Sequence, residues 1–82
     1  MSERQMLRAR RADKKDRLET LQSRGSSLVA QIRRDLGGGY VENVTDLKIE
    51  RAESTFEQIK KVVQEARELE EEISDLNDRI EG

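Results

Sequence analysis

A regular apolar stripe runs through the second half of the chain, from Ile49 to Ile80. Its hydrophobic residues recur at alternating steps of three and four, a spacing that keeps side chains on one face of an α-helix and is typical of coiled coils. One extra step of three at Ala66 predicts a local rotation of the stripe. We therefore expect a long helix that another helix must cover. The stripe consists of Ile49, Ala52, Phe56, Ile59, Val63, Ala66, Leu69, Ile73, Leu76 and Ile80.

The first half carries a weaker stripe of the same period. It begins behind a capping-box sequence, in which Ser2 and Gln5 can satisfy each other's backbone amides at a helix start. The pattern predicts a first helix over about residues 3–36, thin near its start and solid farther on. The in-phase positions are Leu7, Arg11, Lys14, Leu18, Leu21, Gly25, Leu28 and Ile32.

Three consecutive glycines separate the two stripes. Glycine adopts the left-handed conformation after a helix at no steric cost, so residues 37–42 are predicted to form a turn. Asn43 and Thr45 are good capping residues, which predicts a second helix over about residues 43–81. The expected fold is all-α: residues 1–82 form one antiparallel, coiled-coil-like hairpin of two long helices, which we expect to pair into a four-helix assembly.

A turn centred near Gly39 also predicts which residues face each other. It places Leu7 opposite Glu72 and Leu18 opposite Lys61. The basic start of the chain, with seven Arg and Lys in residues 4–17, then lies beside the acidic end, with eight Asp and Glu in residues 65–81. Opposite charges beside a helical seam select partner and orientation more than they add stability.

Two positions have more than one interpretation. Gly25 sits in a weak stretch of the first helix, where it either lets the facing helix approach closely, for example beside Phe56, or acts as a hinge, or breaks the helix in two. Tyr40 at the turn either packs over the helix ends or offers a contact to a partner at the tip.

Composition excludes several kinds of chemistry. Charged residues make up 41% of the chain and aromatic residues 2%, and Cys and His are absent, which removes disulfides, thiolate nucleophiles and the commonest general base. The glycine run lacks the Lys-Ser/Thr of a phosphate-binding loop, and no residues assemble a catalytic site. We expect a non-enzyme without cofactor or metal. No apolar run is long enough to span a bilayer, and the first residues lack a signal-peptide core, so a cytoplasmic protein is expected.

The favoured function is therefore protein–protein interaction or scaffolding by an oligomerising hairpin, with a homodimer favoured because a lone hairpin this thin is marginal. The candidate interface residues are Leu18, Leu21, Leu28, Ile32, Phe56, Ile59, Val63, Leu69, Ile73 and Leu76.

The alternatives are an adaptor or chaperone for secretion or phage assembly, and a nucleic-acid-associated accessory protein. The latter would use a short basic segment to neutralise phosphates, although no aromatic residues are interleaved with it. Its candidate contacts are Arg8, Arg10, Arg11, Lys14 and Lys15.

Overall fold

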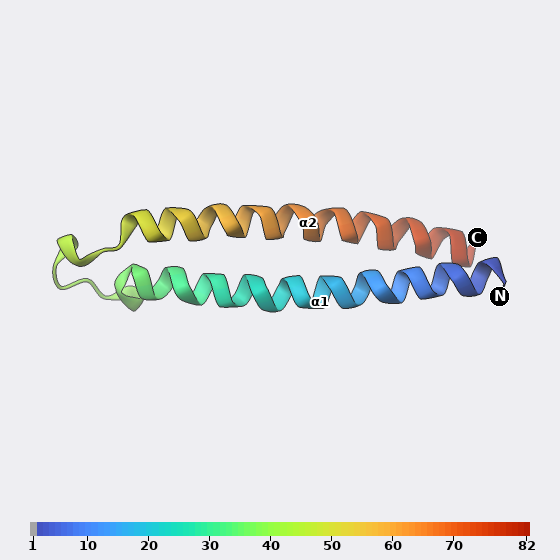
Figure 1. Ribbon diagram of the computed structural model, residues 1–82, viewed down its shortest axis with the longest axis horizontal. Helices are drawn as coiled ribbons and strands as arrows, with labels where there is room; N and C mark the ends of the chain where they lie inside the picture. Colours follow the sequence, from blue (N-terminus) through green and yellow to red (C-terminus); the bar gives the residue numbers. More distant parts are fainter. Residues whose placement is uncertain (1) are drawn as a thin grey trace.

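The computed structural model describes residues 2–82 and shows two long antiparallel helices. Helix α1 spans Glu3–Asp35 and helix α2 spans Ile49–Glu81. The connection contains two short 3-10 turns, η1 (Gly37–Gly39) and η2 (Val44–Asp46). The hairpin measures 62 × 16 × 14 Å, with both ends of the chain at the same end of the rod (Figure 1). The predicted all-α hairpin is therefore confirmed.

Helix α1 forms as the sequence predicts. The Ser2 hydroxyl accepts from the Gln5 amide at 3.2 Å, and the Gln5 side chain accepts from the Ser2 amide at 3.1 Å, which completes the capping box. The helix runs unbroken through Gly25 to Asp35. Every in-phase position predicted for its stripe is buried or half-buried, including the polar Arg11 and Lys14.

Helix α2 presents a slightly different stripe from the predicted one. Thr55 and Val62 face α1, whereas Phe56 and Val63 remain exposed. With this exchange the steps alternate strictly between three and four, and the extra step of three disappears. The reason is that the α1 stripe is itself regular, so a constant phase along α2 keeps the two stripes in contact without a local rotation. The observed stripe is Ala52, Thr55, Ile59, Val62, Ala66, Leu69, Ile73, Leu76 and Ile80.

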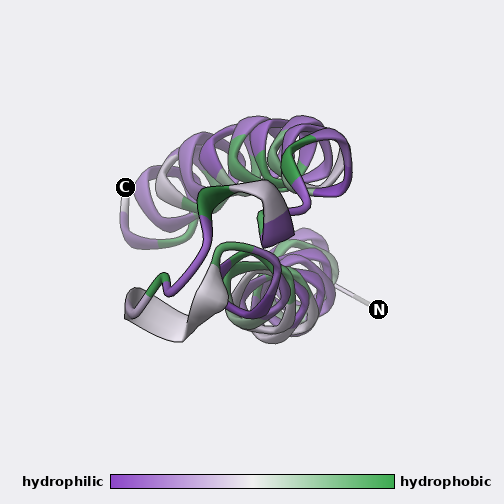
Figure 2. Cartoon of the chain, turned by 90° about the vertical axis from the view of Figure 1, so that its left-hand side faces the viewer, coloured by the Kyte–Doolittle hydropathy of each residue, from purple (hydrophilic) through white to green (hydrophobic). Residues whose placement is uncertain are grey.

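The hydrophobic seam lies between the helices. Viewed from the loop end, hydrophobic bands recur where α1 and α2 face each other, and most of the outer surface is hydrophilic (Figure 2). At the terminal end Leu7, Leu76 and Ile80 form a buried cluster. The start of the α1 stripe, where hydrophobic residues are sparse, is thus buried by residues near the C-terminal end of α2.

The connection is longer than predicted, and α2 begins at Ile49 rather than near residue 43. Gly37, Gly38 and Gly39 all have positive φ and turn the chain away from α1. Asn43 does cap a turn, since its side chain accepts from the Thr45 amide at 3.0 Å, but that turn is only η2. The chain then becomes extended at Leu47, because it must still cross to the far side of the seam before a helix can run back.

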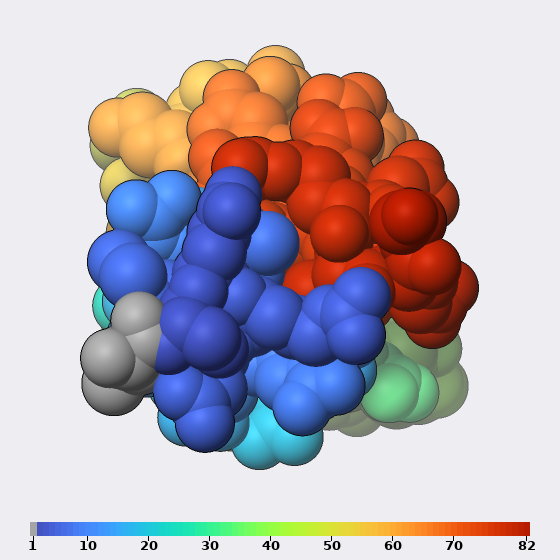
Figure 3. Space-filling view, turned by 90° about the vertical axis from the view of Figure 1, so that its right-hand side faces the viewer, coloured from blue at the N-terminus to red at the C-terminus, as the bar shows by residue number. Residues whose placement is uncertain are grey.

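The longer connection shifts the register between the helices. Leu7 packs against Leu76 and Ile80 rather than lying opposite Glu72, and Glu72 instead pairs with Lys14. The predicted placement of facing residues was therefore wrong by about two helical turns. The broader expectation holds: the basic start of α1 lies along the acidic end of α2, as the view of the terminal end shows (Figure 3).

Asp35 occupies the last seam position of α1, at the neck of the hairpin. Its carbonyl accepts from the Lys48 amide at 3.1 Å, which ties the return of the chain to the end of α1. Its side chain is buried, with Oδ1 3.8 Å from Nε of the exposed Arg51 and no hydrogen-bond partner for Oδ2 among the described residues. A buried carboxylate oxygen without a partner destabilises the fold at this point.

Candidate protein-interaction surfaces

One side of the hairpin is lined by ion pairs between the helices. Lys14 Nζ lies 2.7 Å from Glu72 Oε2, and Arg17 lies 3.0 Å from Glu65 Oε1 and donates two hydrogen bonds to that carboxylate. We call this the charged side. Its ion pairs are half-exposed, so each adds only about 0.2–1 kcal/mol, and their main effect is on orientation and register.

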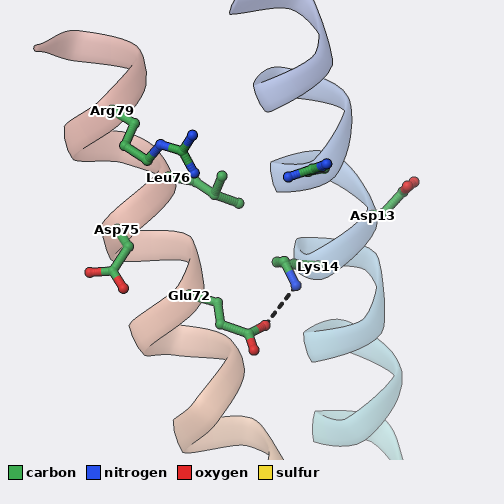
Figure 4. A pocket seen from close by; sticks show the side chains of 7 residues that line it. Asp13, Lys14, Glu72, Asp75, Leu76 and Arg79 are labelled. Carbon is green, nitrogen blue, oxygen red and sulfur yellow. Dashed lines mark hydrogen bonds and ion pairs between the residues drawn. The ribbon is translucent and has the colours of Figure 1, made fainter. Parts of the chain in front are cut away.

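A shallow open groove follows the charged side near the chain ends (Figure 4). Lys14 and Glu72 point toward each other from the two helices, and Leu76 points into the space between the helices one turn farther along α2. The lining carries both signs of charge in similar number, which favours neither an anionic nor a cationic ligand. Its lining residues are Arg10, Asp13, Lys14, Glu72, Asp75, Leu76 and Arg79.

The basic residues proposed for nucleic-acid contact divide into two groups. Lys14 is paired with Glu72, and Arg11 donates a 2.8 Å hydrogen bond to Asn77. Arg8, Arg10 and Lys15 are exposed, and no ion pair is found for them within the part of the chain that the structure describes. Among the residues that the structure describes, no aromatic side chain lies in this segment, so base stacking has no platform here.

The opposite side of the hairpin carries most of the exposed large hydrophobic residues of both helices. Phe56 is 52% exposed, Ile49 and Val29 are 47% exposed, and Val63 and Leu36 are 38% and 37% exposed. On each helix these residues are spaced by seven and flank the seam at the same heptad position, so they line one side of the antiparallel pair. We call these five residues the lateral surface. Contiguous exposed apolar patches on small proteins mark interaction sites.

Phe56 is the largest member of the lateral surface. Lys60 Nζ lies 5.3 Å from the centre of its ring, a cation–π contact that covers part of one face. The sequence placed Phe56 in the seam and beside Gly25. The structure instead places Val62 beside Gly25, 3.7 Å from where a Cβ would lie, and leaves Phe56 at the surface.

The candidate interface residues separate into three classes in the structure. Leu21, Leu28, Leu69 and Leu76 are buried in the seam, and Leu18, Ile32, Ile59 and Ile73 are half-buried in it. Phe56 and Val63 are exposed on the lateral surface. Sequence reasoning missed Val29 and Leu36 as candidates, although their spacing of seven, and the matching spacing of Ile49, Phe56 and Val63, was a signal that could have found them.

The only tyrosine of the chain, Tyr40, lies exposed at the tip of the hairpin. Tyr40 is 76% exposed, so it does not close over the helix ends as one interpretation required. It lines a small hollow of the connection together with Asn43 and Lys48. An exposed tyrosine at the tip is compatible with a contact to a partner, which stays a prediction.

Within residues 2–82, no group of three or more Asp and Glu side chains has the arrangement of a metal site. Neither α1 nor α2 has a stretch long and hydrophobic enough to cross a membrane.

Comparison of the chain with protein-family models, with curated proteins and with solved structures finds no match in any of the three.

Proposed function

We propose that this protein is a non-enzymatic protein–protein interaction or scaffold protein whose binding site is the lateral surface. The observation that carries the proposal is the position of Val29, Leu36, Ile49, Phe56 and Val63, five exposed hydrophobic side chains on one side of a rod that is otherwise mostly polar. A partner helix or bundle laid along them would remove apolar area from water and gain the corresponding free energy.

The contrast with the seam supports this proposal. Thr55 and Val62 complete the contact with α1, so Phe56 and Val63 lie outside the seam and keep 52% and 38% of their surface exposed. Large hydrophobic residues that the fold of one chain does not bury are explained economically by a second protein that buries them. Catalysis has no comparable support, because the grooves are lined by charged side chains of both signs and the chain lacks Cys and His.

Affinity capture tests the proposal directly. Tagged wild-type chain and the Phe56→Glu variant are used to capture proteins from the source cell, and the recovered proteins, including further copies of the chain, are identified by mass spectrometry. Met6→Glu is the matched control, since Met6 is 47% exposed but lies off the lateral surface. We expect capture by wild type and Met6→Glu and its loss with Phe56→Glu. Equal recovery by all three chains would contradict the proposal.

Nucleic-acid association is the second candidate, and one observation favours it: Arg8, Arg10 and Lys15 stay exposed beside a helix that neutralises Lys14. Such binding would depend on counterion release and would fall steeply between low and moderate salt. The test is a fluorescence titration of a labelled duplex with the wild-type chain and with the double variant Arg8→Glu, Arg10→Glu. Absence of binding at low salt would eliminate this candidate.

A further inference from the structure

We infer that the lateral surface is the contact between two copies of this chain, which pack with their loops at the same end, so that α1 of each hairpin lies against α2 of the other. The inference rests on the proposed function and deepens it, because it names the partner and the arrangement of the complex. In the resulting four-helix bundle every helix is antiparallel to both of its neighbours, a common arrangement of such bundles.

The register between α1 and α2 determines which residues of the two helices lie at the same height on the lateral side. Asp35–Arg51, Gly25 beside Val62 and Lys14–Glu72 share one register. The same register sets the facing positions on the lateral side, which change from apolar at the loop end to charged toward the chain ends. In order they are Leu36 with Ile49, Val29 with Phe56, Gln22 with Val63, and Lys15 with Glu70.

A twofold axis parallel to the rod makes this side complementary to itself. It places each α1 residue of one copy against the α2 residue that faces it within its own hairpin. Val29 then meets Phe56 of the second copy, and Lys15 meets Glu70 of the second copy. Farther out on the same side, Arg33 meets Glu53 and Glu19 meets Arg67. All charged contacts made in this way join opposite signs, which favours this partner and this orientation.

If the two copies packed with their loops at opposite ends, the same apolar residues would be buried, but few oppositely charged residues would meet. Centred on Phe56, this reversed orientation lays α1 on α1 and α2 on α2, so that Ile49 meets Val63 of the second copy. Glu53 against Lys60 is then the one opposite-charge contact at the centre, and Lys15 and Glu70 extend past the loop of the second copy. The arrangement with loops together therefore matches the charge pattern over the whole length.

The size of the side is sufficient for a stable dimer. A rod 62 Å long and 14 to 16 Å across offers roughly 900 Å² on one side, and stable protein interfaces bury about 800 Å² from each partner. The apolar half at the loop end supplies the hydrophobic part of such an interface, and the charged half toward the chain ends supplies its polar part.

Sedimentation equilibrium tests the inference. We expect a concentration-dependent dimer for wild type and for Met6→Glu, and a dimer dissociation constant at least about thirtyfold higher for Phe56→Glu, as for a central hot-spot residue. Val63→Glu is a second variant on the same surface, and circular dichroism establishes that each variant is still helical. A wild-type monomer at all concentrations, or a Phe56→Glu chain that dimerises as well as wild type, would overturn the inference.

Disulfide cross-linking determines the orientation, and the absence of native Cys makes it unambiguous. A mixture of Gln22→Cys chains with Val63→Cys chains should cross-link under mild oxidation if the loops lie together. A mixture of Ile49→Cys with Val63→Cys should do so only in the reversed orientation, and that result would overturn the proposed arrangement.

Failure of this inference remains distinct from failure of the proposed function. If the wild-type chain is a monomer and yet Phe56→Glu abolishes capture of a different protein, the second copy is the wrong occupant and the lateral surface remains a binding site. If the chain is a monomer and capture does not depend on Phe56, both are wrong.

Discussion

The charged side and the lateral surface flank the same seam on the same two helices. On the charged side the side chains of the two helices pair with each other, whereas on the lateral surface they remain exposed. On the charged side, Arg17 and Lys14 of α1 pair with Glu65 and Glu72 of α2, so the two helices are joined there within one chain. On the lateral surface, Val29 of α1 and Phe56 of α2 remain exposed although both helices contribute hydrophobic residues to it. One side thus specifies how the hairpin closes, and the other keeps hydrophobic residues exposed, which we propose a second protein covers.

The largest effect is expected in the seam that both sides share. Leu21 is 2% exposed, so Leu21→Ala leaves a cavity and should lower the free energy of unfolding by about 2–5 kcal/mol. Urea denaturation followed by circular dichroism measures the change. Met6→Ala is the control, because the exposed Met6 should cost much less. A similar loss in both variants would mean that the seam is not where the structure places it.

The neck of the hairpin offers a stabilising change. Asp35→Leu keeps the branching and the number of heavy atoms of the side chain, but removes a buried carboxylate oxygen without a partner and extends the apolar seam. The loose contact with the exposed Arg51 is a small loss. We expect the free energy of unfolding to rise by about 1–3 kcal/mol. A fall measured by thermal denaturation would show that the Asp35 carboxylate has a favourable partner in solution.

Two glycine substitutions should act in opposite directions. A Cβ at Gly25 would meet Val62 at an ordinary contact distance, so Gly25→Ala should raise the free energy of unfolding by roughly 1 kcal/mol through helix propensity. Gly38 has φ of 66°, so Gly38→Ala should lower it by about 1–2 kcal/mol despite open space around it. Destabilisation by Gly25→Ala would support the hinge interpretation of that position, which the unbroken helix α1 disfavours.

The smallest changes in stability are expected for single substitutions on the charged side and on the lateral surface. On the charged side, Arg17→Glu should cost about 0.2–1 kcal/mol of unfolding free energy, and Glu65→Arg in the same chain should recover most of it. On the lateral surface, Phe56→Ser should change the stability of the dissociated hairpin less than a seam substitution does, because 52% of Phe56 is already exposed to water. Denaturation at a protein concentration too low for dimerisation measures the stability of the single hairpin for each variant. Lack of recovery in the double charge variant would mean that the ion pair does not form.

The prediction from sequence succeeded where local chemistry decides the outcome. The capping box at Ser2, the glycine turn and the apolar period of α1 each follow from residues close together in the chain, and all three are found in the structure. The choice between Phe56 and Thr55 for the seam was wrong, because either residue joins Ala52 to Ile59 by one step of three and one step of four, so the spacing alone fits both. That choice depends on the register of the opposite helix, which the longer connection shifts.

The sequence by itself determined two amphipathic helices, the place where the chain turns back, and the matching of a basic start with an acidic end, because helical period, capping residues and glycine are local properties. Tertiary structure alone decided that α2 starts at Ile49, that Lys14 meets Glu72, and that Phe56 and Val63 fall outside the seam. These outcomes depend on how many residues the connection needs to reach from the end of α1 to the start of α2. That number is set by how the two helices pack together, and not by the local sequence of either helix.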